Sequence, residues 1–226
     1  MLFRSYFLKG LQNGWDKQPR VQLLIRHPGE KFVLRHENEW PIARTQWTRY
    51  HLHPDHLALG KTPNKSTKTI TYEALGDGVT FSTPQLDKEA EFTGPMALKL
   101  FVSSSTVDVD IFAILRVFDP QNKEVLFQGA LDPKTPIAQG WLRASHRKLD
   151  QAKSLPYRPY HTHDEKQLLT PGKIYELDIE IWPTCIVVPA GYRVALTVKG
   201  KDYDHGQSAA SLSNMKNPMK IGRAHV

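Results

Sequence analysis

The chain has one cysteine in 226 residues, no apolar run long enough to cross a membrane, and no Gly-x-Ser-x-Gly pentapeptide. The lone Cys185 cannot form an internal disulfide, which excludes the disulfide-stapled secreted class and fits a reducing compartment. A membrane helix needs about 18 consecutive apolar residues, so no membrane span is expected. The pentapeptide places a serine nucleophile on a strained turn that needs both glycines, and its nearest match, Gly206-Gln207-Ser208-Ala209-Ala210, lacks the second. Ser208 is therefore expected to be ordinary loop surface.

Acidic residues are in the minority, with 23 Asp and Glu against 30 Lys and Arg, for a net charge of +7. The basic residues are scattered, and the longest basic cluster, Arg143 to Lys148, is short and interrupted by Ala, Ser and His. A mildly basic, solvated surface is expected rather than a nucleic-acid interface. The first ten residues have no long apolar centre and no small-residue cleavage site, so no signal peptide is expected and the cytoplasm is favoured over secretion.

Most of the chain shows the patterns of β-strands. Phe3 to Leu11 is the exception, because its apolar spacing predicts an amphipathic helix that stops at Gly10. Alternating or β-branched runs predict the strands that follow: Val21–Ile25, Lys31–Arg35, Thr48–Leu52, Lys68–Tyr72, Leu98–Val102, Ile111–Phe118, Val125–Phe127, Gly140–Arg147, Ile174–Trp182, Cys185–Val188 and Arg193–Val198.

Turn-forming residues separate these strands at short intervals. Examples are Thr93-Gly94-Pro95, Asp119-Pro120-Gln121-Asn122, Pro171-Gly172 and Ala190-Gly191. The second of these lies between two apolar arms and predicts a hairpin. Residues 151–169 have neither helical nor strand periodicity and are expected to form a long loop. The fold expected is mainly β, an antiparallel sandwich.

Several motifs, in order along the chain, resemble one enzyme family. Phe7-Leu8-Lys9-Gly10, Asn13-Gly14-Trp15-Asp16 and Glu39-Trp40-Pro41 resemble the end of the α/β-hydrolase domain in the X-Pro dipeptidyl-peptidase and cocaine esterase (CocE/NonD) family. Later segments resemble that family's C-terminal jelly-roll, a galactose-binding-like sandwich. They are Gly94-Pro95, Asp108-Val109-Asp110-Ile111-Phe112, Gly140-Trp141-Leu142-Arg143-Ala144-Ser145-His146-Arg147, Pro171-Gly172 and Ala190-Gly191-Tyr192-Arg193.

The resemblance implies a domain layout for the chain. Residues 1–46 would be the remnant of the hydrolase domain with its connection, and residues 47–220 would be the jelly-roll domain. Residues 221–226, Ile-Gly-Arg-Ala-His-Val, coincide with the translation of a common sequencing-library adapter and are expected to be an artefact. The intact protein is then expected to be longer at both ends.

The resemblance also implies hydrolysis through an acyl-enzyme, with a Ser-Asp-His triad that precedes the segment similar to Phe3–Gly10. No catalytic residue can therefore be assigned in this chain, and it is expected to be inactive alone. No cofactor or metal is expected. The expected partners are an α/β-hydrolase domain absent from this chain and, for the intact parent, a small acyl or X-Pro peptide substrate. A homo-oligomer is left open, and neither nucleic acid nor membrane is expected to bind.

Five constellations could carry other chemistry. His51, His53 and His56 with Asp55 could bind a metal, as could His161 and His163 with Asp164, although surface histidines are the simpler interpretation. Asp108 and Asp110 could act as paired carboxylates, but carboxylates at the start of a strand usually cap turns or pair with bases such as Arg143 or Arg147.

Ser145 and His146 could suggest a nucleophile and base, yet neighbours on a strand point to opposite faces, so this pair is rejected. Trp141, Trp182 and Tyr192 could form an aromatic platform for sugars, although burial in the core is the expected role. Two functions stay open. The first is the non-catalytic jelly-roll part of a serine hydrolase, which packs on the active site and helps to wall it. The second is an autonomous sandwich that binds carbohydrate or another ligand.

Overall fold

The computed structural model describes residues 2–64, 67–129, 132 and 134–203. Its elements follow one another in the order α1 (Leu2–Lys9), η1 (Trp15–Lys17), β1 (Val21–His27), β2 (Lys31–Glu37), β3 (His51–His53), β4 (Ala58–Gly60), β5 (Val79–Ser82), β6 (Ala90–Val102), β7 (Asp110–Phe118), β8 (Ala138–Arg143), η2 (Ala144–His146), β9 (Tyr175–Val188) and β10 (Arg193–Lys199). Ser208 and the suspected adapter residues lie outside the described residues. No described helix is long and apolar enough to span a membrane.

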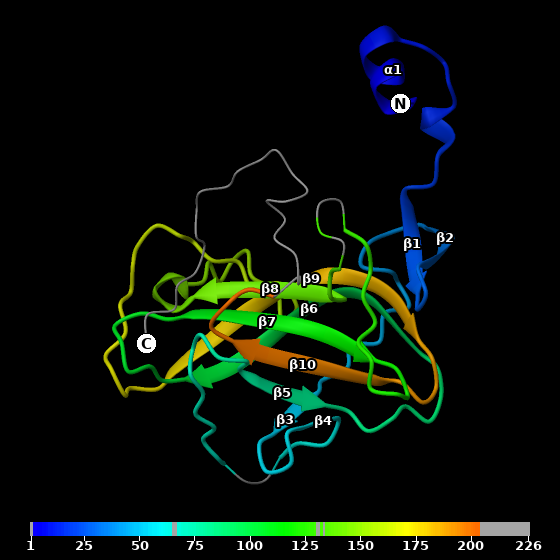
Figure 1. Ribbon diagram of the computed structural model, residues 1–226. Coiled ribbons are helices and arrows are strands. Elements are labelled where there is room, and N and C mark those ends of the chain that lie inside the picture. The colour runs from blue at the N-terminus through cyan, green and yellow to red at the C-terminus, as the bar shows by residue number, and fades with distance from the viewer. Residues whose placement is uncertain (1, 65–66, 130–131, 133, 204–226) are drawn as a thin grey trace.

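Two sheets face each other and form the expected jelly-roll β-sandwich (Figure 1). One has four strands in the order β2-β1-β9-β6, and the other has six in the order β3-β4-β5-β10-β7-β8. Pairing is antiparallel except between β1 and β9 and between β4 and β5. The long β6–β9 ladder runs from Ala90 opposite Val188 to Val102 opposite Tyr175.

The core lies between the two sheets. Inward positions alternate along β9, where Leu177, Ile179 and Ile181 are buried. They meet residues of β7 such as Ala113 and Val117 from the opposite sheet. This alternation leaves the residues between them on the outer faces, which decides what the surface displays.

A bulge in β6 corrects one prediction. Thr93-Gly94-Pro95 was expected to form a turn, but the strand continues through it, and the register against β9 shifts between Gly94 and Met96. Proline has no N–H to give to the ladder and is tolerated in a sheet at such irregularities. Gly94 takes φ of 145°, a conformation that side chains rarely adopt. The two residues bend the strand instead of reversing it.

Other strand predictions were wrong in extent. Residues 68–72 and 125–127 form no strand, and the strand expected from Thr48 begins at His51. Gly140–Arg147 was expected to be one strand, but β8 ends at Arg143 and the 3₁₀ helix η2 follows. The predicted hairpin turn is present, with Asn122 N donating to Asp119 O, although its second arm pairs only through the Phe118–Glu124 bridge.

The helix α1 stands clear of the sandwich, at the end of an extended segment that leads to β1 (Figure 1). It ends where predicted, because Gly10 adopts φ of 64° and Leu11 N then donates to Ser5 O at 3.2 Å. None of its residues is buried. Phe3 packs against Trp15, with ring centroids 5.3 Å apart, but the helix buries none of its apolar side chains on the sandwich.

The β1–β2 hairpin, which the sequence analysis placed in residues 1–46, is hydrogen-bonded to the sandwich through β9. The ladder between β1 and β9 consists of the single pair Arg26–Ile186. Beyond it, Arg26 Nη2 donates to Ile137 O at 2.7 Å, and Gln128 N donates to the Glu30 carboxylate at 2.6 Å. The hairpin is thus held mainly by side chains. The domain boundary at residue 46 stays a prediction.

The two sheets come very close at Gly140 of β8. A Cβ atom at this position would lie 2.0 Å from the carbonyl oxygen of Glu180 and 2.9 Å from Cα of Ile181, both backbone atoms of β9. Backbone cannot move aside as a flexible side chain can. Only glycine therefore allows this approach of β8 to β9.

Gly140→Ala should lower the free energy of unfolding by about 2 kcal/mol or more, because the added methyl overlaps backbone that is fixed by the β6–β9 ladder. Urea denaturation would measure the loss. Gly172→Ala is the matched control, because Gly172 has φ of 77° but no atom within 4 Å of an added Cβ. The control should lose only about 1 kcal/mol for backbone strain. Equal losses in the two variants would contradict the overlap.

Candidate functional site

Two exposed tryptophans lie side by side on the outer surface of the sandwich. Trp141 of β8 is 48% exposed and Trp182 of β9 is 60% exposed, and their ring centroids are 5.1 Å apart. The expectation that both are core residues was wrong. Trp141 lies between the inward-facing Gly140 and Leu142 and so must point outward, which strict alternation along the strand would have shown. Tyr192, by contrast, is half-buried and packs against the core.

The tryptophan pair lies at one side of a groove between the β1–β2 hairpin and the β8–β9 edge. The groove has a volume of about 700 Å³. Nine of its fifteen lining residues are apolar or aromatic and six are polar or charged: Leu24, Arg26, Trp40, Asp132, Thr135, Pro136, Ile137, Ala138, Gln139, Trp141, Trp182, Pro183, Thr184, Cys185 and Asp202. Such a mixed lining suits a ligand or a protein segment that carries both apolar and polar groups.

The main cation of the groove is already engaged by protein atoms. The Arg26 guanidinium donates to Ile137 O and to the Thr184 hydroxyl, and it lies 4.8 Å from the centre of the Phe127 ring. Burial lowers the pKa of Arg26 and raises that of its neighbour Cys185. Arg26 thus ties the hairpin to the groove floor and is poorly placed to bind an anionic substrate.

Apolar exposure continues from the groove onto one face of the hairpin, and the helix has exposed apolar side chains of its own. The side chains concerned are large: Leu2, Phe3, Phe7, Leu8 and Leu11 in or next to α1, and Leu24, Phe32 and Leu34 in the hairpin. Single exposed apolar residues are common on protein surfaces, but a set of this size marks an interaction site. We call these residues, with Trp141 and Trp182, the apolar surface.

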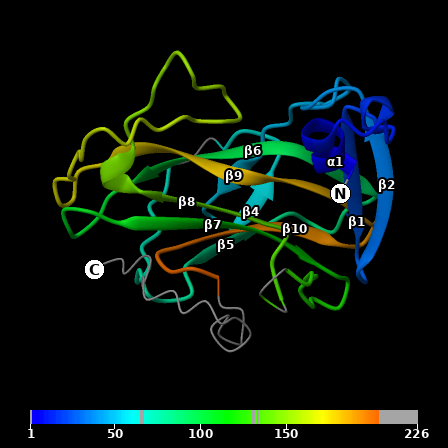
Figure 2. The same ribbon diagram turned by 90° about the horizontal axis from the view of Figure 1, so that it is seen from above.

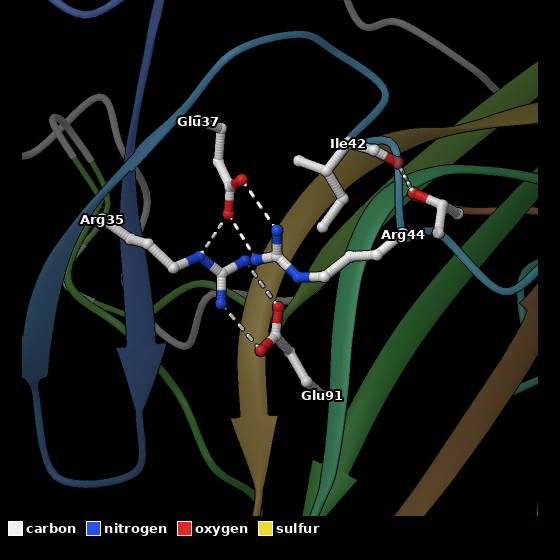
Figure 3. Close-up of polar contacts among 6 residues, drawn as sticks. Arg35, Glu37, Ile42, Arg44 and Glu91 are labelled. Carbon is white, nitrogen blue, oxygen red and sulfur yellow. Dashed lines mark hydrogen bonds and ion pairs between the residues drawn. The ribbon is translucent and has the colours of Figure 1, made fainter.

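A network of four charges also fixes the hairpin, because its side chains link β2 and the segment after it to β6 (Figure 3). Arg35 donates twice to Glu91, at 2.8 and 2.7 Å, and forms an ion pair with Glu37. Arg44 also donates twice to Glu37, at 2.8 Å for one of the two bonds. These bonds hold the pKa of Glu37 and Glu91 below their usual values. The bidentate geometry sets the position of the hairpin against the sheet.

The two aspartates at the start of β7 have structural roles. Asp110, which is 7% exposed, accepts from Arg143 Nε at 2.7 Å and from Nη2 at 2.8 Å. Asp108 instead caps the backbone and accepts from the N–H groups of Val109 and Ser145. This arrangement confirms the expected pairing with Arg143. It leaves no pair of free carboxylates for acid–base catalysis.

Ser145 and His146 do not form a catalytic pair. Ser145 is completely buried, and its hydroxyl has no hydrogen-bond partner among the described residues. The two residues lie in η2 and not on a strand, so the geometric reason given for rejecting them was wrong. His146 instead meets His163, with 3.2 Å between their Nδ1 atoms.

The histidine groups that were considered as metal sites do not gather ligands. His53 Nε2 is bonded to the carbonyl oxygen of Thr62 at 3.0 Å. Within the described part of the chain, no three His, Cys, Asp or Glu side chains are placed to hold a metal ion. The surface interpretation of His51, His53 and His56 is the one that this geometry supports.

The sandwich and its hairpin match a known domain. Residues 13–216 match the family model described as the X-Pro dipeptidyl-peptidase C-terminal non-catalytic domain. The chain belongs to this family.

Solved structures and curated relatives agree with the assignment. A CocE/NonD family hydrolase from Staphylococcus aureus has a TM-score of 0.83 and 27% identity, over 99% of this chain and 39% of its own. Cocaine esterase from a Rhodococcus species is 23% identical over 89% of this chain and 37% of its own. An aminopeptidase from a marine Thaumarchaeota archaeon shares the fold, with a TM-score of 0.60 at 14% identity.

This chain of the X-Pro dipeptidyl-peptidase C-terminal family spans less than two fifths of the lengths of these relatives. Its matched portion corresponds to a domain described as non-catalytic. Ser145 is sealed in the core and Asp110 is held by Arg143, so neither of these two candidate residues is free to act in catalysis.

Arg143→Met should destabilise the domain by about 2 kcal/mol, because it leaves the buried Asp110 carboxylate without its partner. Asp110→Asn/Arg143→Met should recover part of this loss, since no unpaired buried charge then remains. Urea denaturation at neutral pH gives each value. Lys148→Met serves as the control, because Lys148 lies in exposed ion pairs that contribute little. A double variant no more stable than Arg143→Met would contradict this account.

Proposed function

We propose that this domain docks through the apolar surface onto the α/β-hydrolase domain of a longer serine hydrolase and helps to wall its active site. The observation that carries the proposal is the exposure of large apolar side chains along α1, the β1–β2 hairpin and the tryptophan pair. The intact protein would hydrolyse acyl esters or X-Pro peptides through an acyl-enzyme.

The arrangement of this surface supports an intramolecular partner. The helix α1 projects from the sandwich with its apolar residues uncovered, and a free-standing sandwich has no use for such a helix. The hairpin beneath it is fixed by Arg26 and by the bonds between Arg35 and Glu91, so it presents its outer face at a set angle. A surface that is fixed before docking loses little conformational entropy on binding.

A second function, carbohydrate binding by an autonomous sandwich, is favoured by one observation, the exposed Trp141–Trp182 pair. The two rings are tilted by 51° to each other at a centroid separation of 5.1 Å. They therefore contact one another and do not form a flat shelf on which sugar rings stack. The apolar residues around them, such as Leu24, also suit a protein partner better than a polar sugar.

The domain-docking function is tested first on the DNA around this reading frame and then on the intact protein. An upstream in-frame segment with Gly-x-Ser-x-Gly followed by Asp and His is expected. In the protein encoded by the whole frame, Trp141 and Trp182 should be protected from oxidative footprinting, while Trp47, which is 54% exposed, stays reactive. Equal labelling of all three tryptophans, or binding of glycans by the 226-residue chain, would favour the autonomous sandwich.

The chain alone should not hydrolyse an activated ester or an X-Pro anilide, because the triad that the reaction needs is expected in the missing domain. Release of the chromophore would be followed by absorbance at micromolar protein. A commercial esterase serves as the positive control for the substrates. Hydrolytic activity that co-purifies with the chain would contradict the proposal that the catalytic residues lie in a domain outside it.

The isolated chain should also self-associate, because its apolar surface is open to solvent. Light scattering after size-exclusion chromatography should show mixed oligomers. Phe7→Ser/Leu8→Lys should shift the distribution toward monomer by removing two of the most exposed apolar side chains. Gln12→Lys adds the same charge at an exposed polar position and should not. A monodisperse wild-type monomer would count against a surface that needs a partner.

A further inference from the structure

Three imidazoles meet where the long segment 147–174 folds back on the sandwich. His146 belongs to η2 at the start of this segment, while His161 and His163 lie near its middle. The Nδ1 atoms of His146 and His163 are 3.2 Å apart, and the rings of His161 and His163 are 6.0 Å apart. Residues far apart along the segment thus make a compact histidine cluster.

The contact between His146 and His163 admits one proton. Two Nδ1 atoms form a hydrogen bond only when one carries an N–H and the other offers a lone pair. If both rings were protonated, two N–H groups would face each other at 3.2 Å and the bond would be replaced by repulsion. The bonded geometry is therefore incompatible with the charge state that low pH favours.

The backbone at His163 adopts an uncommon conformation beside this contact. Its φ is 53°, in the left-handed region, which few residues other than glycine adopt, although histidine does so more often than most. Such a conformation persists when surrounding contacts hold it. The adjacent contacts are Thr162 N to Lys148 O at 3.1 Å and the bond from His163 to His146. If the imidazole contact were lost, one of the interactions that hold His163 in this conformation would be missing.

His161 adds a second penalty for protonation. Its Nε2 is buried without a hydrogen-bond partner among the described residues. Burial, and then the neighbouring His163, lower the pKa of His161 below the ordinary value of 6.5. Because the folded state binds the proton less readily than the unfolded state, this residue favours folding above pH 6.5 and loses that contribution as the pH falls.

The charges around the cluster are already paired. On the segment itself, Lys148 lies 3.0 Å from Asp164 and 3.4 Å from Glu165. From the sandwich, Asp178 of β9 faces His161 but also pairs with Lys99 of β6 at 3.0 Å. These carboxylates are therefore poorly available to neutralise new imidazolium charges.

The last facing cation, Arg147, is engaged too. Its guanidinium donates to the carbonyl oxygens of Ala144 and Gln167 and lies 4.6 Å from the centre of the Tyr175 ring. These bonds, with Leu169 N to Val107 O at 2.7 Å, secure the segment beyond residue 166 to the sandwich without any histidine. Protonation of the cluster would thus act on residues 148–165 and leave the rest in place.

The part of the segment that the cluster controls extends away from the sandwich (Figure 2). At its far end, the ring of Tyr157 stacks on Trp47, with centroids 4.2 Å apart and planes 10° from parallel. Between the stack and the cluster, Asp150 N donates to Tyr160 O at 2.8 Å. The stack therefore covers part of Trp47 only while the segment is closed.

We propose that the histidine cluster is a proton-sensitive latch, which holds residues 148–165 closed over Trp47 at neutral pH and releases them in mild acid. While one N–H is shared between the Nδ1 atoms of His146 and His163, the segment is closed. A second N–H at this contact would break the bond and remove its support from the backbone at His163. Tyr157 then leaves Trp47, and the indole ring of Trp47 becomes more exposed to solvent.

Hydrogen exchange of the 226-residue chain, followed by mass spectrometry between about pH 8 and pH 5, tests the latch. Peptides within 148–165 should exchange about tenfold faster at low pH, after correction for the intrinsic rate, while β9 peptides keep their protection. Trp47 emission should change over the same pH range, and Trp47→Phe should abolish that change. Exchange that rises equally in β9 would mean global unfolding and would overturn the proposal.

His163→Asn is the decisive variant, because asparagine tolerates the left-handed backbone and does not titrate in this range. The response of residues 148–165 to pH should shrink by at least half, with little loss of stability at neutral pH. His161→Phe should shrink it too, by removing the buried site of protonation.

His56→Asn is the matched control, because it removes an exposed histidine from the turn between β3 and β4. It should leave the response as in wild type. An unchanged pH response in both His163→Asn and His161→Phe would overturn the latch, as would an equal loss in the His56→Asn control. Each of these results is independent of whether the hydrolase domain exists.

Discussion

The approach of β8 to β9 at Gly140 is the constraint on which most of this domain depends. With an added Cβ only 2.0 Å from the Glu180 carbonyl oxygen, the two strands can lie this close only through glycine. Their closeness seals one side of the core between the sheets, and it places Trp141 beside Trp182 on the outside. Gly140 thus determines both how closely the two sheets pack and where the Trp141–Trp182 pair lies on the surface.

Side chains, and not a continuous ladder, join the hairpin to the sandwich. A single residue pair links β1 to β9, so the position of the hairpin is set by Arg26 and by Arg35 with Glu91. Ion pairs of this kind are directional, which favours a defined angle over tight attachment. A defined angle is the property that the proposed docking onto a hydrolase domain requires of the hairpin.

Much of the fold could be predicted from local pattern. Alternation predicted the long strands, and Gly10 marked the end of the helix correctly because both signals depend on neighbouring residues alone. The wrong strand predictions concern residues whose structure depends on pairing with a segment far away in the sequence. Gly94-Pro95 carries every sign of a turn, but pairing with β9 keeps it in a strand. Residues 125–127 have strand composition, yet only isolated bridges reach them.

The candidate site was harder to predict for the same reason. The pairing of Asp110 with Arg143 was predictable from charge, while the exposure of Trp141 and Trp182 was missed because aromatic residues usually lie in cores. The contact between His146 and His163 could not be predicted from the residues next to either, because a segment of more than a dozen residues must fold back to bring them together. Sequence pattern shows which residues can interact, and topology decides which of them meet.

Cys185 is a single attachment site in the groove for a spectroscopic label. It is the only cysteine of the chain and lines the groove beside Thr184. A thiol-reactive dye or spin label would therefore attach at one position, without any background cysteine to remove. Because burial raises its pKa, the thiolate is scarce at neutral pH, and alkylation is expected to be slow until the pH is raised. Whatever fills the groove would slow that reaction further, so the labelling rate becomes a direct report of occupancy.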